Sequence, residues 1–74
     1  MKTFEFNEYG VCDNPETVFQ STAGGIEEIK IEVAQIDGKW VTGVLVFGMG
    51  GGCSNTGSKF EDKEAAILYA IKQV

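Results

Sequence analysis

Apolar and polar residues alternate on both sides of Asp37-Gly38, near the middle of the chain. Asp-Gly between two β-rich runs is the preferred centre of a type I′ hairpin, because its twist matches that of the strands. With Asp37 and Gly38 as the loop, the two residues of each cross-strand pair have sequence numbers that add up to 75. On one face this register pairs Ile29 with Val46, Ile31 with Val44 and Val33 with Thr42. The pattern therefore predicts an antiparallel hairpin with an aliphatic core face.

The other face of the predicted hairpin mixes charged and apolar residues. It pairs Ala34 with Val41, Glu32 with Gly43, Lys30 with Leu45 and Glu28 with Phe47. Two interpretations stay open for its apolar members. Either the N-terminal strand segment or the later loop covers Leu45 and Phe47, or these two residues contribute to an exposed patch for a partner protein. The candidate partner surface consists of Val41, Leu45 and Phe47.

A helix is predicted for residues 62–74, where apolar residues recur at helical spacing. Ile67, Ala70, Ile71 and Val74 form one stripe, which we expect to pack on the aliphatic face of the hairpin. Asp62 is the expected N-cap, although a capping box from Ser58 to Glu61 would start the helix a turn earlier.

The first 25 residues carry weaker signals. Alternation around Phe4 and Phe6 predicts a short first strand, and turn-forming residues follow between positions 9 and 16. Residues 17–20 form a second short strand in this interpretation, before a turn at 21–25. Together these elements predict a single α+β domain over residues 1–74, with an antiparallel sheet of three to four strands and one C-terminal helix packed on one face.

Composition narrows the function classes. The hydrophobic content of 43% is that of a folded chain. The net charge of −5 is concentrated before residue 39, and the chain has neither arginine nor histidine. It therefore lacks the bidentate group that recognises phosphates and guanine, and the side chain that titrates near neutral pH. These features disfavour nucleic acid as a partner. No signal peptide or membrane span is predicted, so we expect a cytoplasmic protein.

Cys12 and Cys53 have neither C-x-x-C spacing nor a histidine to complete a zinc site. Reduced structural thiols are favoured, a disulfide or redox contact stays open, and no metal or cofactor is expected. The carboxylates are interpreted as a solvated surface, so no catalytic residue is proposed.

Residues 48–60 contain five glycines and form the main candidate for ligand binding. The loop follows an apolar run and precedes the predicted helix, as phosphate-binding loops do. However, Ser58 precedes Lys59 where a phosphate-binding motif requires lysine first, and no strand follows the helix. A turning connector is therefore favoured over weak anion or small-ligand binding. The candidate ligand-binding residues are Gly50, Gly51, Gly52, Cys53, Ser54 and Lys59.

Three stretches resemble a group of small uncharacterised proteins from gut bacteria and their phages or mobile elements. They are residues 7–16, residues 35–40, and the glycine-rich loop with its Lys-Glu-Ala-Ala-Ile helix. This resemblance implies an accessory role in the cytosol, with a link to mobile DNA, and assigns no activity to any residue. The strand–strand–helix order also resembles, more faintly, HicB-like antitoxins and double-stranded-RNA-binding domains. In the latter, lysines and arginines neutralise phosphates, whereas here Lys59 and Lys63 lie among acids.

The sequence thus favours a non-catalytic protein-interaction module with a protein partner or a second copy of itself. The alternative is a weak small-ligand, anion or nucleic-acid binder that uses residues 48–59.

Overall fold

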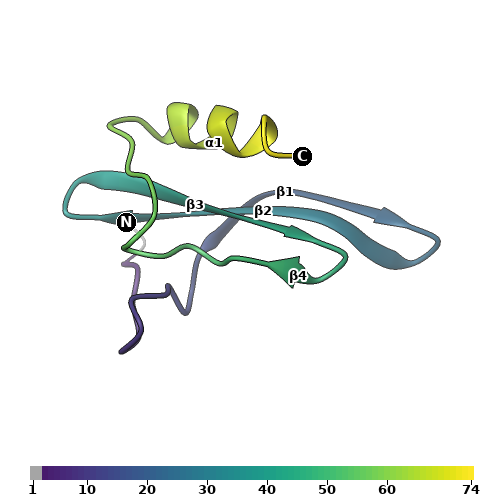
Figure 1. Cartoon of the computed structure of the whole chain (residues 1–74), viewed down its shortest axis with the longest axis horizontal. Helices are drawn as coiled ribbons and strands as arrows, with labels where there is room; N and C mark the ends of the chain where they lie inside the picture. Colours follow the sequence, from purple (N-terminus) through teal and green to yellow (C-terminus); the bar gives the residue numbers. More distant parts are fainter. Residues whose placement is uncertain (1–2) are drawn as a thin grey trace.

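The computed structural model describes residues 3–74, which form a four-stranded antiparallel sheet and one helix (Figure 1). The strands lie in the order in which they follow one another along the chain, so the sheet is a simple meander. The elements are β1 (Glu16–Ala23), β2 (Ile26–Ile36), β3 (Lys39–Val46), β4 (Met49–Gly50) and α1 (Lys63–Ile71). The predicted fold class is confirmed.

The central hairpin between β2 and β3 has the predicted register. Ile29 lies opposite Val46, Ile31 opposite Val44, and the pairing continues to Ile36 opposite Lys39. Asp37 and Gly38 both have positive φ, at 52° and 77°. These values are those of a type I′ turn, which holds the register because a slip of one residue would turn every aliphatic side chain to the other face.

Two further hairpins use the same kind of two-residue loop. Gly24 and Gly25 join β1 to β2, and Phe47 and Gly48 join β3 to β4, all with positive φ. β1 is longer than the predicted strand at 17–20, and its pairing with β2 shifts register twice. The strand β4 was not predicted, because a bulky aromatic residue at positive φ is not a recognisable turn signal.

The sheet is covered on both faces by different parts of the chain (Figure 1). One face, here called the helix face, carries Ile31 and Val33, which are fully buried together with Ala66 and Ala70 of α1. The opposite face carries Ala34 and Val41. These two pack with Cys12 and Cys53 into a buried cluster, and Phe4, Phe6 and Ile36 pack against it. The N-terminal segment and the glycine-rich loop therefore form the third layer.

The expectation of a first strand at Phe4 and Phe6 is wrong. This segment forms one isolated bridge, between Phe6 and Cys12, and does not join the sheet. It turns back on itself because the Asn7 side chain accepts hydrogen bonds from the Tyr9 and Val11 amides, at 2.8 and 3.1 Å. Such an Asx-type contact competes with strand pairing.

The helix differs from its prediction in length and in rotation. It ends at Ile71 and not at Val74, and the Asp62 side chain makes no capping hydrogen bond although Asp62 occupies the N-cap position. Ala66 and Ala70 face the sheet, whereas Ile71 and Val74 are exposed. The predicted stripe is therefore wrong in two of its four members.

The connection into α1 contacts both the sheet and the helix. Trp40 and Phe60 exchange two main-chain hydrogen bonds of 2.7 and 2.8 Å. The Phe60 ring then contacts the Tyr69 ring with centroids 5.1 Å apart. These contacts link the start of β3 to the helix in the orientation in which Ala66 and Ala70 are buried.

Candidate functional site

The glycine-rich loop crosses closely over β3. A Cβ atom at Gly43 would lie 2.6 Å from the carbonyl carbon of Gly52 and 2.8 Å from the Cys53 nitrogen. These distances leave no room for a side chain, so the main chains of β3 and the loop are in direct contact. The loop then pairs with the N-terminal segment, because the Cys12 amide donates to the Cys53 carbonyl at 2.7 Å.

The two cysteines lie together beneath the sheet as free thiols. Burial, reinforced by the charge of Glu32 and by Cys12, raises the pKa of the Cys53 thiol to about 12, while a hydrogen bond with the Gly43 backbone acts in the opposite direction. A thiol of this kind stays protonated at neutral pH and is a poor nucleophile. Cys53 therefore belongs to the core.

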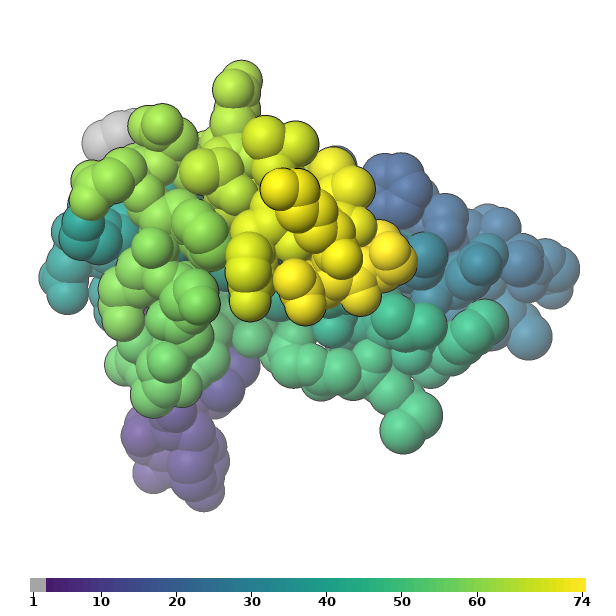
Figure 2. Space-filling view, turned by 45° about the horizontal axis from the view of Figure 1, so that its top comes forward, coloured from purple at the N-terminus to yellow at the C-terminus, as the bar shows by residue number. Residues whose placement is uncertain are grey.

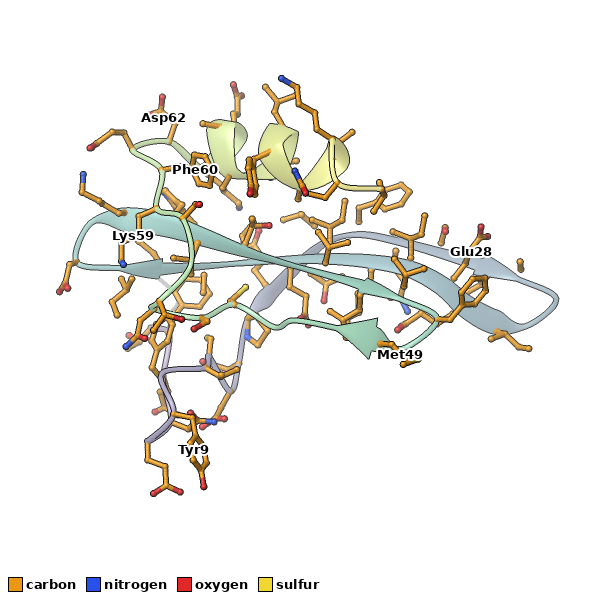
Figure 3. The ribbon with its side chains drawn as sticks, viewed as in Figure 1. Tyr9, Glu28, Met49, Lys59, Phe60 and Asp62 are labelled. Carbon is orange, nitrogen blue, oxygen red and sulfur yellow. The ribbon has the colours of Figure 1, made fainter. Side chains whose placement is uncertain are left out.

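The other candidate ligand-binding residues do not surround a cavity. Gly50 pairs with Leu45 as part of β4, and the hydroxyl groups of Ser54 and Thr56 form a hydrogen bond of 2.8 Å. The Lys59 ammonium donates to the Asn55 carbonyl at 2.6 Å. Gly51 is exposed and Gly52 is half-buried. Lys59 lies on the strand-like connection that rises beside the sheet toward Phe60 and Asp62, and not over the glycines (Figure 3).

The candidate partner surface of Val41, Leu45 and Phe47 is not one surface. Val41 is 1% exposed and belongs to the buried cluster, so its assignment to a partner surface is corrected. The N-terminal segment and the glycine-rich loop cover Val41, whereas the cover expected for Leu45 and Phe47 is incomplete. Leu45 is half-buried, and Phe47 is 63% exposed at the turn before β4.

A larger apolar surface lies on the helix face, beyond the end of α1. The helix of nine residues is about 13 Å long, whereas the eleven residues of β2 extend for about 36 Å. The helix therefore leaves part of the sheet open (Figure 1). By strand register, four apolar side chains lie on the helix side at this open part and beside it, and we call them the open floor. Three form one row across the sheet, and the fourth lies on β1 opposite the buried Ile31: Ile29, Val46 and Met49, and Phe19.

The residues of the open floor are accessible. Phe19 is 50% exposed, Val46 is 41% exposed, and Ile29 is half-buried. Met49 is 77% exposed and is the first residue of β4, and Figure 3 shows it at the lower side of that short strand. None of the four is charged. An uncovered apolar surface of this kind marks an interaction site more often than a scattered apolar residue does.

The outer side of α1 is also apolar. Leu68 lies two residues from both Ala66 and Ala70, which at 100° per residue places it on the opposite side of the helix from the sheet. Leu68 is 58% exposed, and Ile71 beside it is half exposed. A shallow hollow of about 190 Å³ is lined by Glu64, Ile67 and Leu68. Figure 2 shows the helix standing above the sheet, which continues past it.

The open floor and the outer side of α1 together form what we call the apolar step. Sequence reasoning missed it, although one signal was available. The helix predicted for residues 62–74 carries Ile67, Leu68, Ile71 and Val74 in addition to its alanines, which is more large apolar residues than one face of a short helix can bury.

Comparison with protein-family models, with curated proteins and with solved structures finds no match. Over the described part of the chain, none of the helices has the length and apolar character needed to cross a membrane. Residues 3–74 also contain no cluster of three or more side chains able to hold a metal ion.

Proposed function

We propose that the protein is a non-catalytic interaction module that binds protein through the apolar step. The observation that carries this proposal is the open floor. Phe19 is exposed although it lies directly opposite the fully buried Ile31, and Val46 is exposed two residues further along the sheet. Burying such side chains removes apolar area from water, worth about 25 cal/mol per Å². A partner that covers the floor gains this free energy.

The chemistry of the molecule supports a binding role over a catalytic one. The thiol that could act as a nucleophile is buried and protonated, and the chain has no histidine to serve as its base. The two free cysteines fit a reducing compartment, which agrees with an accessory role in the cytosol.

The loop alternative receives less support from the geometry. The main chain of residues 52–55 contacts Gly43, Gly10 and Cys12. These neighbours occupy the positions at which a ligand would have to contact that part of the loop. The hollow on the surface lies against α1 and does not include a residue of this loop.

The proposal is tested by affinity capture from a native lysate with three immobilised full-length baits. These are the wild type, Val46→Glu on the open floor, and Tyr9→Glu as a control with the same charge change. Tyr9 is exposed on the N-terminal segment, below the sheet in Figure 3. We expect a protein retained by the wild type and by Tyr9→Glu but lost with Val46→Glu. Identical retention by all three baits would contradict the proposal.

A further inference from the structure

We propose that Cys12 and Cys53 are a reversible redox pair, which a low-molecular-weight disulfide oxidises to a bond that locks the N-terminal segment onto the glycine-rich loop. The structure holds both residues as free thiols, which is the reduced state of this pair. The pair packs against Ala34 and Val41, on the sheet face opposite α1. The inference therefore goes beyond the proposed function and does not depend on the apolar step.

Main-chain pairing places the two cysteines directly opposite each other. An antiparallel bridge joins Val11 to Ser54. One residue further along, the Cys12 amide donates to the Cys53 carbonyl at 2.7 Å. The side chains of such cross-strand neighbours lie on the same side of the pair. Both side chains accordingly enter one buried cluster.

The spacing of an opposed pair of this kind suits a disulfide. Neighbours that share a main-chain hydrogen bond have Cα atoms about 5.5 Å apart, and disulfides span about 4.4–6.8 Å between Cα atoms. Their Cβ atoms are about 4.5–5.5 Å apart, so they must approach by about 1 Å to reach the separation of a disulfide. Both cysteines lie outside the four strands of the sheet. This approach therefore leaves the register of the sheet unchanged.

The hydrogen bonds around Cys12 tolerate its oxidation. Its thiol donates to Asn14 Oδ1 at 3.5 Å, a contact that oxidation removes. The same oxygen also accepts from the Glu5 amide at 2.8 Å, so it keeps a partner. A disulfide carries no hydrogen-bond donor and therefore brings no unpaired donor into the cluster.

The reaction is thiol–disulfide exchange. The Cys12 thiolate attacks one sulfur of the small disulfide and releases the first small thiolate. The Cys53 thiolate then attacks the Cys12 sulfur of the mixed disulfide and releases the second. The two cysteines lose two electrons to the small disulfide, which leaves as two thiols that carry the protons of the cysteines. Cys12 reacts first because it is 6% exposed, whereas Cys53 is fully buried.

The burial that shields the pair also sets how it reacts. Burial raises the pKa of the Cys53 thiol, so the second step proceeds when the two covering segments open briefly. Residues 3–15 and 51–57 form isolated bridges and no strand of the sheet, and such segments open more readily than central strands do. Buried thiols are also shielded from a second copy of the chain. The exchange therefore favours a bond within one chain.

The bond would connect segments that are distant in sequence. Forty residues lie between the two cysteines, and they include β1, β2 and β3. Closing a loop of this length reduces the conformational entropy of the unfolded chain. We therefore expect the oxidised protein to unfold at a higher urea concentration than the reduced protein.

Mixtures of reduced and oxidised glutathione test the proposal on the full-length protein, with and without a denaturing concentration of urea. Free thiols are alkylated, and each species is identified by its mass without reduction. We expect a monomer lighter by two hydrogen atoms and without glutathione. The folded chain should reach half oxidation at a glutathione ratio at least about tenfold more reducing than the chain in urea, because the fold holds the thiols together.

A register variant is the matched control. The chain with Cys53→Ala and Ser54→Cys keeps two cysteines but moves one of them to the side of its segment away from Cys12. Circular dichroism checks that this variant is folded, and we expect it to lack the tenfold preference. Three results with the wild type would each overturn the proposal: both thiols stay free, glutathione adducts or linked dimers form in place of the internal bond, or oxidation is no easier than in urea. An oxidised wild type with the urea midpoint of the reduced protein would overturn the lock.

Discussion

Replacing Gly43 with alanine should destabilise the protein, because the added methyl group would collide with main-chain atoms of the crossing loop. The new Cβ would lie 2.6 Å from the Gly52 carbonyl carbon and 2.8 Å from both the Gly51 oxygen and the Cys53 nitrogen. Ordinary van der Waals contacts begin near 3.4 Å. The loop or the strand must therefore move apart by more than half an ångström.

The magnitude follows from two opposing effects. Overpacking of this kind costs about 1–3 kcal/mol, while alanine in a strand gains about 0.5–1 kcal/mol over glycine from the reduced entropy of the unfolded chain. We expect a net loss of about 1–2 kcal/mol in the free energy of unfolding. For a domain of this size, that loss lowers Tm by about 5–15 °C.

Urea and thermal unfolding, followed by circular dichroism and by the fluorescence of Trp40, measure this loss. Gly51→Ala is the matched control, since a Cβ there would meet nothing within 4 Å. We expect that variant to be as stable as the wild type or slightly more stable. The reasoning is refuted if Gly43→Ala unfolds at the wild-type midpoint, or if Gly51→Ala loses as much stability.

Three other perturbations have definite expected outcomes. Phe47 has a φ of 52° in a type I′ turn, so Phe47→Asn should raise the free energy of unfolding by about 0.5–1 kcal/mol in urea titrations, and Phe47→Leu should not. The pKa of the Cys53 thiol is about 12 in the folded protein, compared with its ordinary value of 9.0. Between these pH values the folded protein binds more protons than the unfolded protein, so the free energy of unfolding should fall as pH rises from 9 to 12. Urea titrations at each pH should show this fall for the wild type and not for Cys53→Ala. Lys63 pairs with Glu16 and lies 5.5 Å from the Trp40 ring centroid, but the ion pair is partly exposed, so Lys63→Met should cost only about 0–1 kcal/mol in the same titration.

The central hairpin could be predicted in full because its turn and its aliphatic pattern specify the same register. Asp37-Gly38 requires two residues at positive φ, and the branched residues on either side then fall on one face. Both signals are local, so no knowledge of the rest of the chain is needed. The C-terminal helix was found for a similar reason, from the helical spacing of its apolar residues.

The N-terminal segment and the glycine-rich loop could not be predicted, because contacts distant in sequence decide their structure. Cys12 and Cys53 lie opposite each other only because residues 3–15 and 51–57 both pack under β2 and β3. The alternation of Phe4 and Phe6 matches a strand pattern, yet the Asn7 side chain ends the pairing at once. The close crossing of the loop at Gly43 has no local signal.

The rotation of the helix gives the strongest argument that its outer side serves a purpose. Ala66 and Ala70 face the sheet, while Leu68 points away from it. Fully burying a leucine side chain is worth about 1.5–3 kcal/mol, so a helix shaped by stability alone would place leucine inward and alanine outward. In the observed orientation, the ring of Phe60 contacts that of Tyr69. Leu68 is therefore left 58% exposed although its burial would be favourable, and a protein bound to the outer side of α1 would gain that free energy.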